Sequence, residues 1–384
     1  MTHRTFIASL LAAVAVAAQA QAAPITPSHD AQVIETLPAK SAARAEERRL
    51  RKAVQGNPRD AQSAVQLARQ LMDEARELGD PRLAGQAMAA LQPWTDPATA
   101  PTEVLLMQAV VKQFLHDFDG SAHLLERSLA REPRQPQAWL TLATVRRVQG
   151  RYADSDRACQ QLVALGAAVH GPACLAENEA LRGDLDAARQ RLRSLLADPQ
   201  LDANTRNWLL TSVAELEERA GRNEAADAAY KAALAASNDG YSLVAYADFL
   251  IGQGRYRDAL ALLREHPRTD VVLLRLAIAG TRGKVPQAAA DAAEMRERIT
   301  QANLRPEAQT VHGREQALFA LWVDAEPQRA VALARNNVLL QREPIDLLVL
   351  AQAAAAARDA AARQEADRLR KELGLHDRRL DALL

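Results

Sequence analysis

Residues 135–162 read QPQAWLTLATVRRVQGRYADSDRACQQL. Trp139 is followed at helical spacing by Leu142 and Ala143, Gly150 interrupts the helix, and Tyr152 begins a second one. The stretch therefore predicts two amphipathic helices joined by a tight turn. Because a helix pair this short cannot bury its apolar stripe alone, it must stack on neighbouring pairs.

The same pattern recurs along the chain with a period of about 34 residues. Tyr152, Ser155, Cys159 and Leu162 follow Gly150 at the same spacings at which Leu185, Ala188, Leu192 and Leu195 follow Gly183. Turns at Gly221 and Gly254 continue the series, and His116 takes the place of the glycine one repeat before Gly150. The small residue five positions after the turn allows two helices to approach closely, and the larger residue at position nine fills the space beyond it.

On these residues the chain resembles the tetratricopeptide repeat family, most clearly between Leu105 and Leu263. It departs from the family pattern at Ala143, where glycine is usual, and at Arg146, where tyrosine is usual. The resemblance implies an all-α fold, a right-handed superhelical solenoid of stacked antiparallel helix pairs. We expect about nine such pairs over residues 46–384, with a C-terminal capping helix from Glu365 to Leu384.

The resemblance also implies a binding surface, since the first helix of each pair lines the concave groove in this family. The residues carried over to that groove are Thr144, Arg147, Glu177, Trp208, Thr211, Glu215, Tyr241 and Asp248. Rigid aromatic side chains make good interface anchors, so Trp208 and Tyr241 are the sharpest candidates, although both side chains also suit packing between repeats. The Asn and Lys residues with which family members grip a peptide carboxylate are missing from these positions. The expected partner is therefore an extended or helical peptide or protein segment of mixed character.

Composition and motifs argue against several other classes of function. The 48 basic and 48 acidic residues alternate closely along the helices, and no basic stripe interleaved with aromatic residues points to nucleic acid. No metal-ligand spacing, phosphate-binding loop or nucleophile elbow occurs. We therefore expect no catalytic residue, no metal and no cofactor.

Residues 1–22 are typical of a secretory signal peptide. Arg4 precedes an apolar run from Phe6 to Ala18, and Ala20-Gln21-Ala22 provides a small-x-small cleavage site. Residues 23–45 are expected to form a flexible leader. No stretch reaches the roughly 18–20 apolar residues that stable membrane insertion requires. The composition is typical of bacteria, so the predicted location is the periplasm or the medium.

The two cysteines, Cys159 and Cys174, fall at matching heights on the two sides of one predicted turn. An oxidising compartment favours a disulfide between them, which would contribute about 3 kcal/mol to stability. The alternative is that both are small buried side chains that never pair.

Together these features predict a non-catalytic protein-binding scaffold or adaptor of the bacterial cell envelope. One alternative is a metal-binding protein or enzyme that uses His116 and His123 with nearby carboxylates. Another is a structural homo-oligomer in which copies stack end to end.

Overall fold

The computed structural model describes residues 42–304 and 312–384. Its helices are α1 Ala42–Gly56, α2 Ala61–Leu78, α3 Pro81–Ala90, α4 Thr102–Phe114, α5 Phe118–Arg131, α6 Pro136–Val148, α7 Tyr152–Ala164, α8 His170–Leu181, α9 Leu185–Leu196, α10 Ala203–Arg219, α11 Asn223–Ala236, α12 Gly240–Gly252, α13 Tyr256–Leu263, α14 Asp270–Arg282, α15 Ala288–Ala302, α17 Gly313–Trp322, α18 Pro327–Leu340, α19 Pro344–Ala357, α20 Ala360–Leu373 and α21 Arg378–Asp381. The predicted signal peptide lies outside the described residues. Most of the predicted leader does too, but its last four positions belong to α1.

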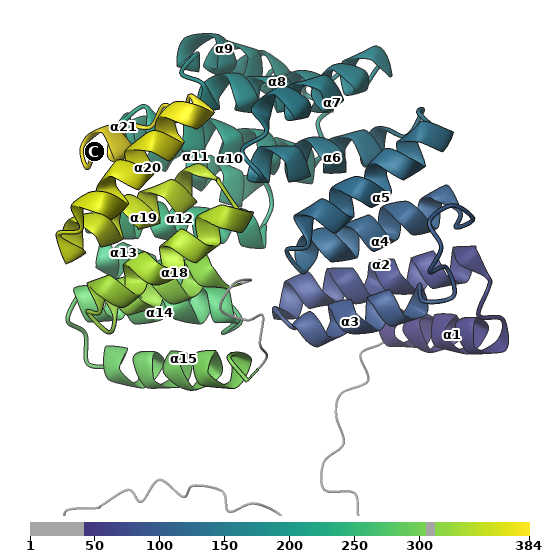
Figure 1. The fold of residues 1–384 in the computed structure, drawn as a ribbon, viewed down its shortest axis with the longest axis horizontal. Coiled ribbons are helices and arrows are strands. Elements are labelled where there is room, and N and C mark those ends of the chain that lie inside the picture. The colour runs from purple at the N-terminus through teal and green to yellow at the C-terminus, as the bar shows by residue number, and fades with distance from the viewer. Residues whose placement is uncertain (1–41, 305–311) are drawn as a thin grey trace, which may run out of the picture. The chain divides into compact units, whose positions relative to one another are not determined.

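Every element in these two described ranges is a helix, and consecutive helices pack against each other (Figure 1). The pairs are α2 with α3, α4 with α5, α6 with α7, α8 with α9, α10 with α11, α12 with α13, α14 with α15, α17 with α18, and α19 with α20. Each first helix also contacts the first helix of the next pair, as α4 contacts α6 and α10 contacts α12. The prediction of an all-α solenoid of stacked antiparallel helix pairs is confirmed.

The turn within each pair explains the repeat pattern. Gly150, Gly183, Gly221 and Gly254 all have positive φ, between 71° and 96°. His116 adopts φ 63° at the equivalent turn between α4 and α5, so it occupies the same left-handed conformation at a steric cost that glycine avoids. Backbone conformation, and not only helical periodicity, fixes this position.

The residues that follow each turn are buried between the two helices of the pair, as their sizes predict. The small residues five positions on are fully buried, and in two repeats they also tie the pair together. Ser121 Oγ donates to the Ala109 carbonyl and Ser155 Oγ donates to the Ala143 carbonyl, both at 2.8 Å. The larger residues at position nine, Leu125, Cys159, Leu192, Tyr230 and Leu263, are at most 1% exposed.

The C-terminal helices pack on the turns of the middle repeats, a contact that the repeat pattern does not predict. The amide of Arg342 donates to the Val148 carbonyl at 2.7 Å, and the amide of His376 donates to the Leu181 carbonyl at 2.9 Å. Tyr152 and Leu181 accordingly belong to the apolar core formed mainly by α14 and α17–α20. Within the compact unit Glu47–Leu384, the segments that follow α18 and α20 therefore contact α6 and α8, which are far earlier in the stack.

The chain end is not one continuous helix over Glu365–Leu384. Gly374 adopts φ 61° and ends α20, and the short helix α21 follows with Asp377 as its N-cap. The break turns Leu375 and Leu380 into the core, where both are at most 2% exposed. A straight helix would have placed these two leucines on different faces.

Candidate functional site

The residues predicted to line the groove are largely engaged with one another across successive first helices. We call this set the cross-helix ladder; it comprises Arg147 of α6, Glu177 of α8, Trp208, Thr211, Ser212 and Glu215 of α10, Tyr241, Ser242 and Asp248 of α12, and Arg275 of α14. Thr144 is the one predicted groove residue outside it, because its hydroxyl donates to the Leu140 carbonyl of its own helix at 3.1 Å.

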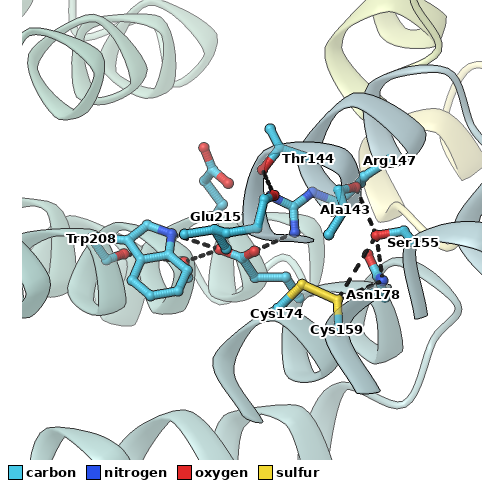
Figure 2. A network of polar contacts seen from close by, with 12 residues as sticks. Ala143, Thr144, Arg147, Ser155, Cys159, Cys174, Asn178, Trp208 and Glu215 are labelled. Atoms are coloured by element: carbon cyan, nitrogen blue, oxygen red, sulfur yellow. Dashed lines mark hydrogen bonds and ion pairs between the residues drawn. A yellow bond between two sulfur atoms is a disulfide. The ribbon is translucent and has the colours of Figure 1, made fainter. Parts of the chain in front are cut away.

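Glu177 has the most partners in the first half of the ladder, and two of them, Arg147 and Trp208, are labelled in Figure 2. Its carboxylate forms an ion pair with Arg147 and accepts hydrogen bonds from Trp208 Nε1 at 2.9 Å and Ser212 Oγ at 2.6 Å. The Glu177 side chain is only 15% exposed. Burial opposes the charge of Arg147, but the neighbouring Glu177 carboxylate outweighs it and raises the pKa of the guanidinium. One carboxylate therefore fixes side chains from α6 and α10 at once.

The next rung joins α10 to α12. Tyr241 OH donates to Glu215 Oε1 at 2.6 Å, yet the Tyr241 side chain remains 63% exposed. The Glu215 charge raises the pKa of Tyr241 well above its usual value. Burial raises the pKa of Glu215 itself, although Arg219 opposes this. Tyr241 is thus a neutral, rigidly held aromatic side chain that presents its ring to solvent.

Two further rungs join side chains of neighbouring first helices to one another. Thr211 Oγ1 and Ser242 Oγ lie 2.7 Å apart, and Ser242 Oγ also donates to Asn207 Oδ1 at 2.8 Å. Asp248 accepts two hydrogen bonds from the Arg275 guanidinium, at 2.9 and 2.7 Å. Bidentate pairing of this kind satisfies both charges, so neither side chain is offered to a partner.

A pocket of about 480 Å³ opens between the N-terminal ends of α10 and α12. Its lining residues are Asn204, Asn207, Trp208, Thr211, Ser237, Asn238, Asp239, Tyr241 and Ser242. We call it the Trp208–Tyr241 pocket. Of the predicted groove residues, the structure places Trp208, Thr211 and Tyr241 in this pocket and the other five elsewhere.

The polar lining of the pocket was missed by the sequence reasoning. It comes from the short loop Ser237–Asp239 and from α10 residues that satisfy that loop. Asn207 donates to the carbonyls of Ala233 and Ser237, and Asp239 caps α12 by accepting from the amide of Ser242. The signal available was the run Ser-Asn-Asp-Gly, whose residues favour a turn and a helix N-cap.

The disulfide lies next to the ladder. Cys159 of α7 and Cys174 of α8 are joined in the structure with a Cα–Cα distance of 5.6 Å, which is usual for the bond (Figure 2). Asn178, one turn further along α8, donates to Ser155 Oγ and to Asp156 Oδ1, both at 2.9 Å. The bond therefore fastens the helix that carries Glu177.

The two histidines of the metal-binding alternative are not brought together. His116 occupies the turn after α4, where its ring stacks on Phe118 at 5.6 Å and lies 6.1 Å from the ring of His312. His123 is exposed on α5. Across residues 42–304 and 312–384, no group of three or more His, Cys, Asp or Glu side chains is arranged to hold a metal ion.

The helices of the described ranges also include none that combines the length and apolar character needed to cross a membrane.

No protein-family model matches the chain, and no curated protein matches it. Among solved structures it resembles a chain of the APC/C hetero-tetramer Cut9-Hcn1, with a TM-score of 0.37 and 12% identity over 80% of this chain and 52% of that one. It also resembles yeast Tom70, with a TM-score of 0.37 and 14% identity over 86% of this chain and 81% of that one. The chain thus spans about half the length of the first of these. Likenesses of this size carry no argument about function.

Proposed function

We propose that the protein is a non-catalytic scaffold that binds a peptide or protein segment at the Trp208–Tyr241 pocket. The observation that carries the proposal is the 63% exposure of Tyr241 beside a pocket of about 480 Å³. Large aromatic side chains that stay exposed in a fixed orientation are favoured interface anchors, because little rotamer entropy is lost on binding.

The cross-helix ladder fixes the orientation of both aromatic side chains. Trp208 is held by its hydrogen bond to Glu177 and by stacking on the His170 ring, whose centroid is 5.5 Å away. Tyr241 is held by Glu215. His170 does not line the pocket, so the stacked ring supports the indole without filling the space. Two acidic residues of the predicted groove, Glu177 and Glu215, thus support the two anchors.

We also propose that the protein is exported from the cytoplasm. An envelope adaptor would carry the cleavable segment 1–22, and an oxidising compartment suits the Cys159–Cys174 bond. Fractionation of cells that express the full chain, with intact-mass measurement, should find the protein outside the cytoplasm and lacking residues 1–22. An uncleaved cytoplasmic protein would contradict this part of the proposal.

Selection of displayed peptides tests the binding function directly. We expect a library of random peptides panned against the mature chain to yield binders. Replacing Trp208 and Tyr241 with Ala should weaken their affinity by at least tenfold, about 1.4 kcal/mol or more, while far-ultraviolet circular dichroism is unchanged. Leu339→Ala removes another exposed large side chain, 73% exposed on α18, and serves as the matched control. Equal affinity for all three proteins would show that the pocket is not the binding site.

A further inference from the structure

We propose that the Trp208–Tyr241 pocket receives a positively charged side chain, lysine or arginine, of the bound segment. The inference rests on the proposed function and specifies which chemistry the pocket selects. It is motivated by the ring geometry, by the charges around the pocket and by the makeup of its lining.

The two aromatic rings are both polarised toward a cation. The polar hydrogen of each ring is donated to a carboxylate, Trp208 Nε1–H to Glu177 and Tyr241 O–H to Glu215. A hydrogen bond from the ring edge to an anion increases the electron density of the π system, and the ring face then attracts cations more strongly. Two rings supported in this way from adjacent helices line one pocket.

The charges around the pocket are also of the sign that a cation requires. None of the nine lining residues is basic, and the one ionised side chain among them is the exposed Asp239. Behind the rings, Glu215 accepts a hydrogen bond from Tyr241 and has no ion pair within 4 Å in the described ranges, although the charge of Arg219 partly offsets its own. The charges of Glu215 and Glu343 both raise the pKa of Tyr241, and they outweigh the opposing charge of Arg147. An incoming ammonium or guanidinium group would be attracted by Glu215 and by Asp239 at the pocket.

The remaining lining excludes the other classes of side chain. Ser237 Oγ donates to Asn204 Oδ1 at 2.8 Å, but an apolar group would still displace water from the side-chain amides of Asn204 and Asn238, which costs free energy for each lost hydrogen bond. An acidic group would face Asp239 and the Glu215 charge. A long basic side chain instead stacks its stem on an aromatic ring and offers donors to the amide and hydroxyl oxygens.

The test uses the peptides obtained by display selection against the mature chain. We expect Lys or Arg to recur at one position of the selected peptides. In a synthetic peptide from that set, norleucine at this position should weaken binding about tenfold, whereas trimethyl-lysine, which keeps the charge but lacks donors, should bind within about threefold of lysine. Higher salt should weaken the lysine peptide more than the norleucine peptide.

Glu215→Gln supplies the second readout, with the melting temperature measured to show that the variant is folded. The advantage of lysine over norleucine should shrink in this variant and should persist in Asp186→Asn, which changes an acidic side chain that is 89% exposed outside the pocket. If the peptides bind through Trp208 and Tyr241 but norleucine binds as tightly as lysine, the cation preference is wrong and the scaffold function stands. If no peptide depends on the two aromatic residues, both proposals are wrong.

Discussion

At the residue scale, Gly183 meets two separate requirements. Its φ of 96° is a conformation that residues with a Cβ rarely adopt. In addition, a Cβ at this position would lie 2.8 Å from two atoms of the His376 ring, which comes from the C-terminal segment. Gly254 shares the first requirement, with φ 71°, but a Cβ there would meet no atom within 4 Å. Comparison of the two glycines therefore separates backbone strain from the long-range contact.

We predict that Gly183→Ala destabilises the protein more than Gly254→Ala does. Each substitution places alanine in the left-handed region, at a cost of about 1–2 kcal/mol. Gly183→Ala adds the clash with His376, worth about 1–3 kcal/mol more. Urea denaturation of both variants measures the difference, and equal losses of stability would show that the contact with His376 contributes nothing.

Asp227 is the residue whose ionisation should affect stability most clearly at low pH. Burial of its carboxyl group raises the pKa, but hydrogen bonds from Lys231, Arg255 and Tyr246 outweigh this and lower it to about 2. The contacts are 2.6 Å to Lys231 Nζ, 2.6 Å to Arg255 Nη1 and 2.9 Å to Tyr246 OH. They connect α11, α12 and the start of α13.

Because the pKa of folded Asp227 lies below its ordinary value of 3.8, the stabilisation is complete above pH 4 and is lost as the pH falls toward 2. We predict that the wild-type protein loses about 1 kcal/mol more stability than Asp227→Asn between pH 5 and pH 2, after allowance for screening by solvent. Asp186→Asn, which changes a side chain that is 89% exposed, should follow the wild-type curve. Parallel pH curves for the wild type and Asp227→Asn would contradict the assignment.

At the scale of elements, the Cys159–Cys174 bond fastens α7 to α8 across a separation of 15 residues. Closing a loop of this length restricts the unfolded chain and contributes about 3 kcal/mol. The same helix α8 carries Glu177, which supports Trp208. Loosening α8 should therefore affect the pocket as well as stability.

We predict that reduction lowers the free energy of unfolding by about 3 kcal/mol and weakens the binding of selected peptides. The double variant Cys159→Ser/Cys174→Ser should show both effects without reductant and should not respond further when reductant is added. Denaturation and peptide titration with and without reductant provide the measurements. Stability that is unchanged by reduction would show that the packing of Asn178 and Ser155 is sufficient to hold the helices.

The elements show which parts of the fold could be predicted from sequence. The turns were predictable because each requires a residue in the left-handed conformation, and the register of the repeat was kept even where His116 replaced glycine.

The cross-helix ladder was not predicted, because it depends on which side chains of one first helix face which side chains of the next. That signal is present in the sequence, because Arg147 and Glu177 are 30 residues apart and Asp248 and Arg275 are 27 apart. Of the pocket, only the aromatic anchors and Thr211 were anticipated, because the polar loop lies outside the repeat pattern.

At the scale of the whole molecule, the contact between the C-terminal segment and the middle repeats departs from ordinary solenoid behaviour. In a simple solenoid each repeat contacts only its neighbours, so the ends unfold independently. Here Arg379 pairs with Glu218 at 2.5 Å across a separation of 161 residues, and His376 donates to Leu181. In Figure 1 the short helix α21 is drawn close to α10, in agreement with this pair.

We predict that deletion of residues 375–384 destabilises the middle repeats as well as the C-terminal pair. Hydrogen exchange should accelerate at the ends of α8 and α10, which lose the partners His376 and Arg379, and should be unchanged in α2–α4. Arg379→Ala should reproduce the effect at α10 alone. Arg368→Ala, at an ion pair with both side chains more than half exposed, is the control. Acceleration confined to α19 and α20 would contradict the long-range role.

The bond between Arg342 and Val148 has a consequence for how the protein folds. The two residues are separated by about 190 positions, so an interval passes during folding before the two segments meet. During that interval Gly150 and Gly183 face water, and Tyr152 and Leu181 lack the apolar neighbours that finally cover them. High contact order of this kind slows folding and prolongs the time during which these apolar side chains can aggregate.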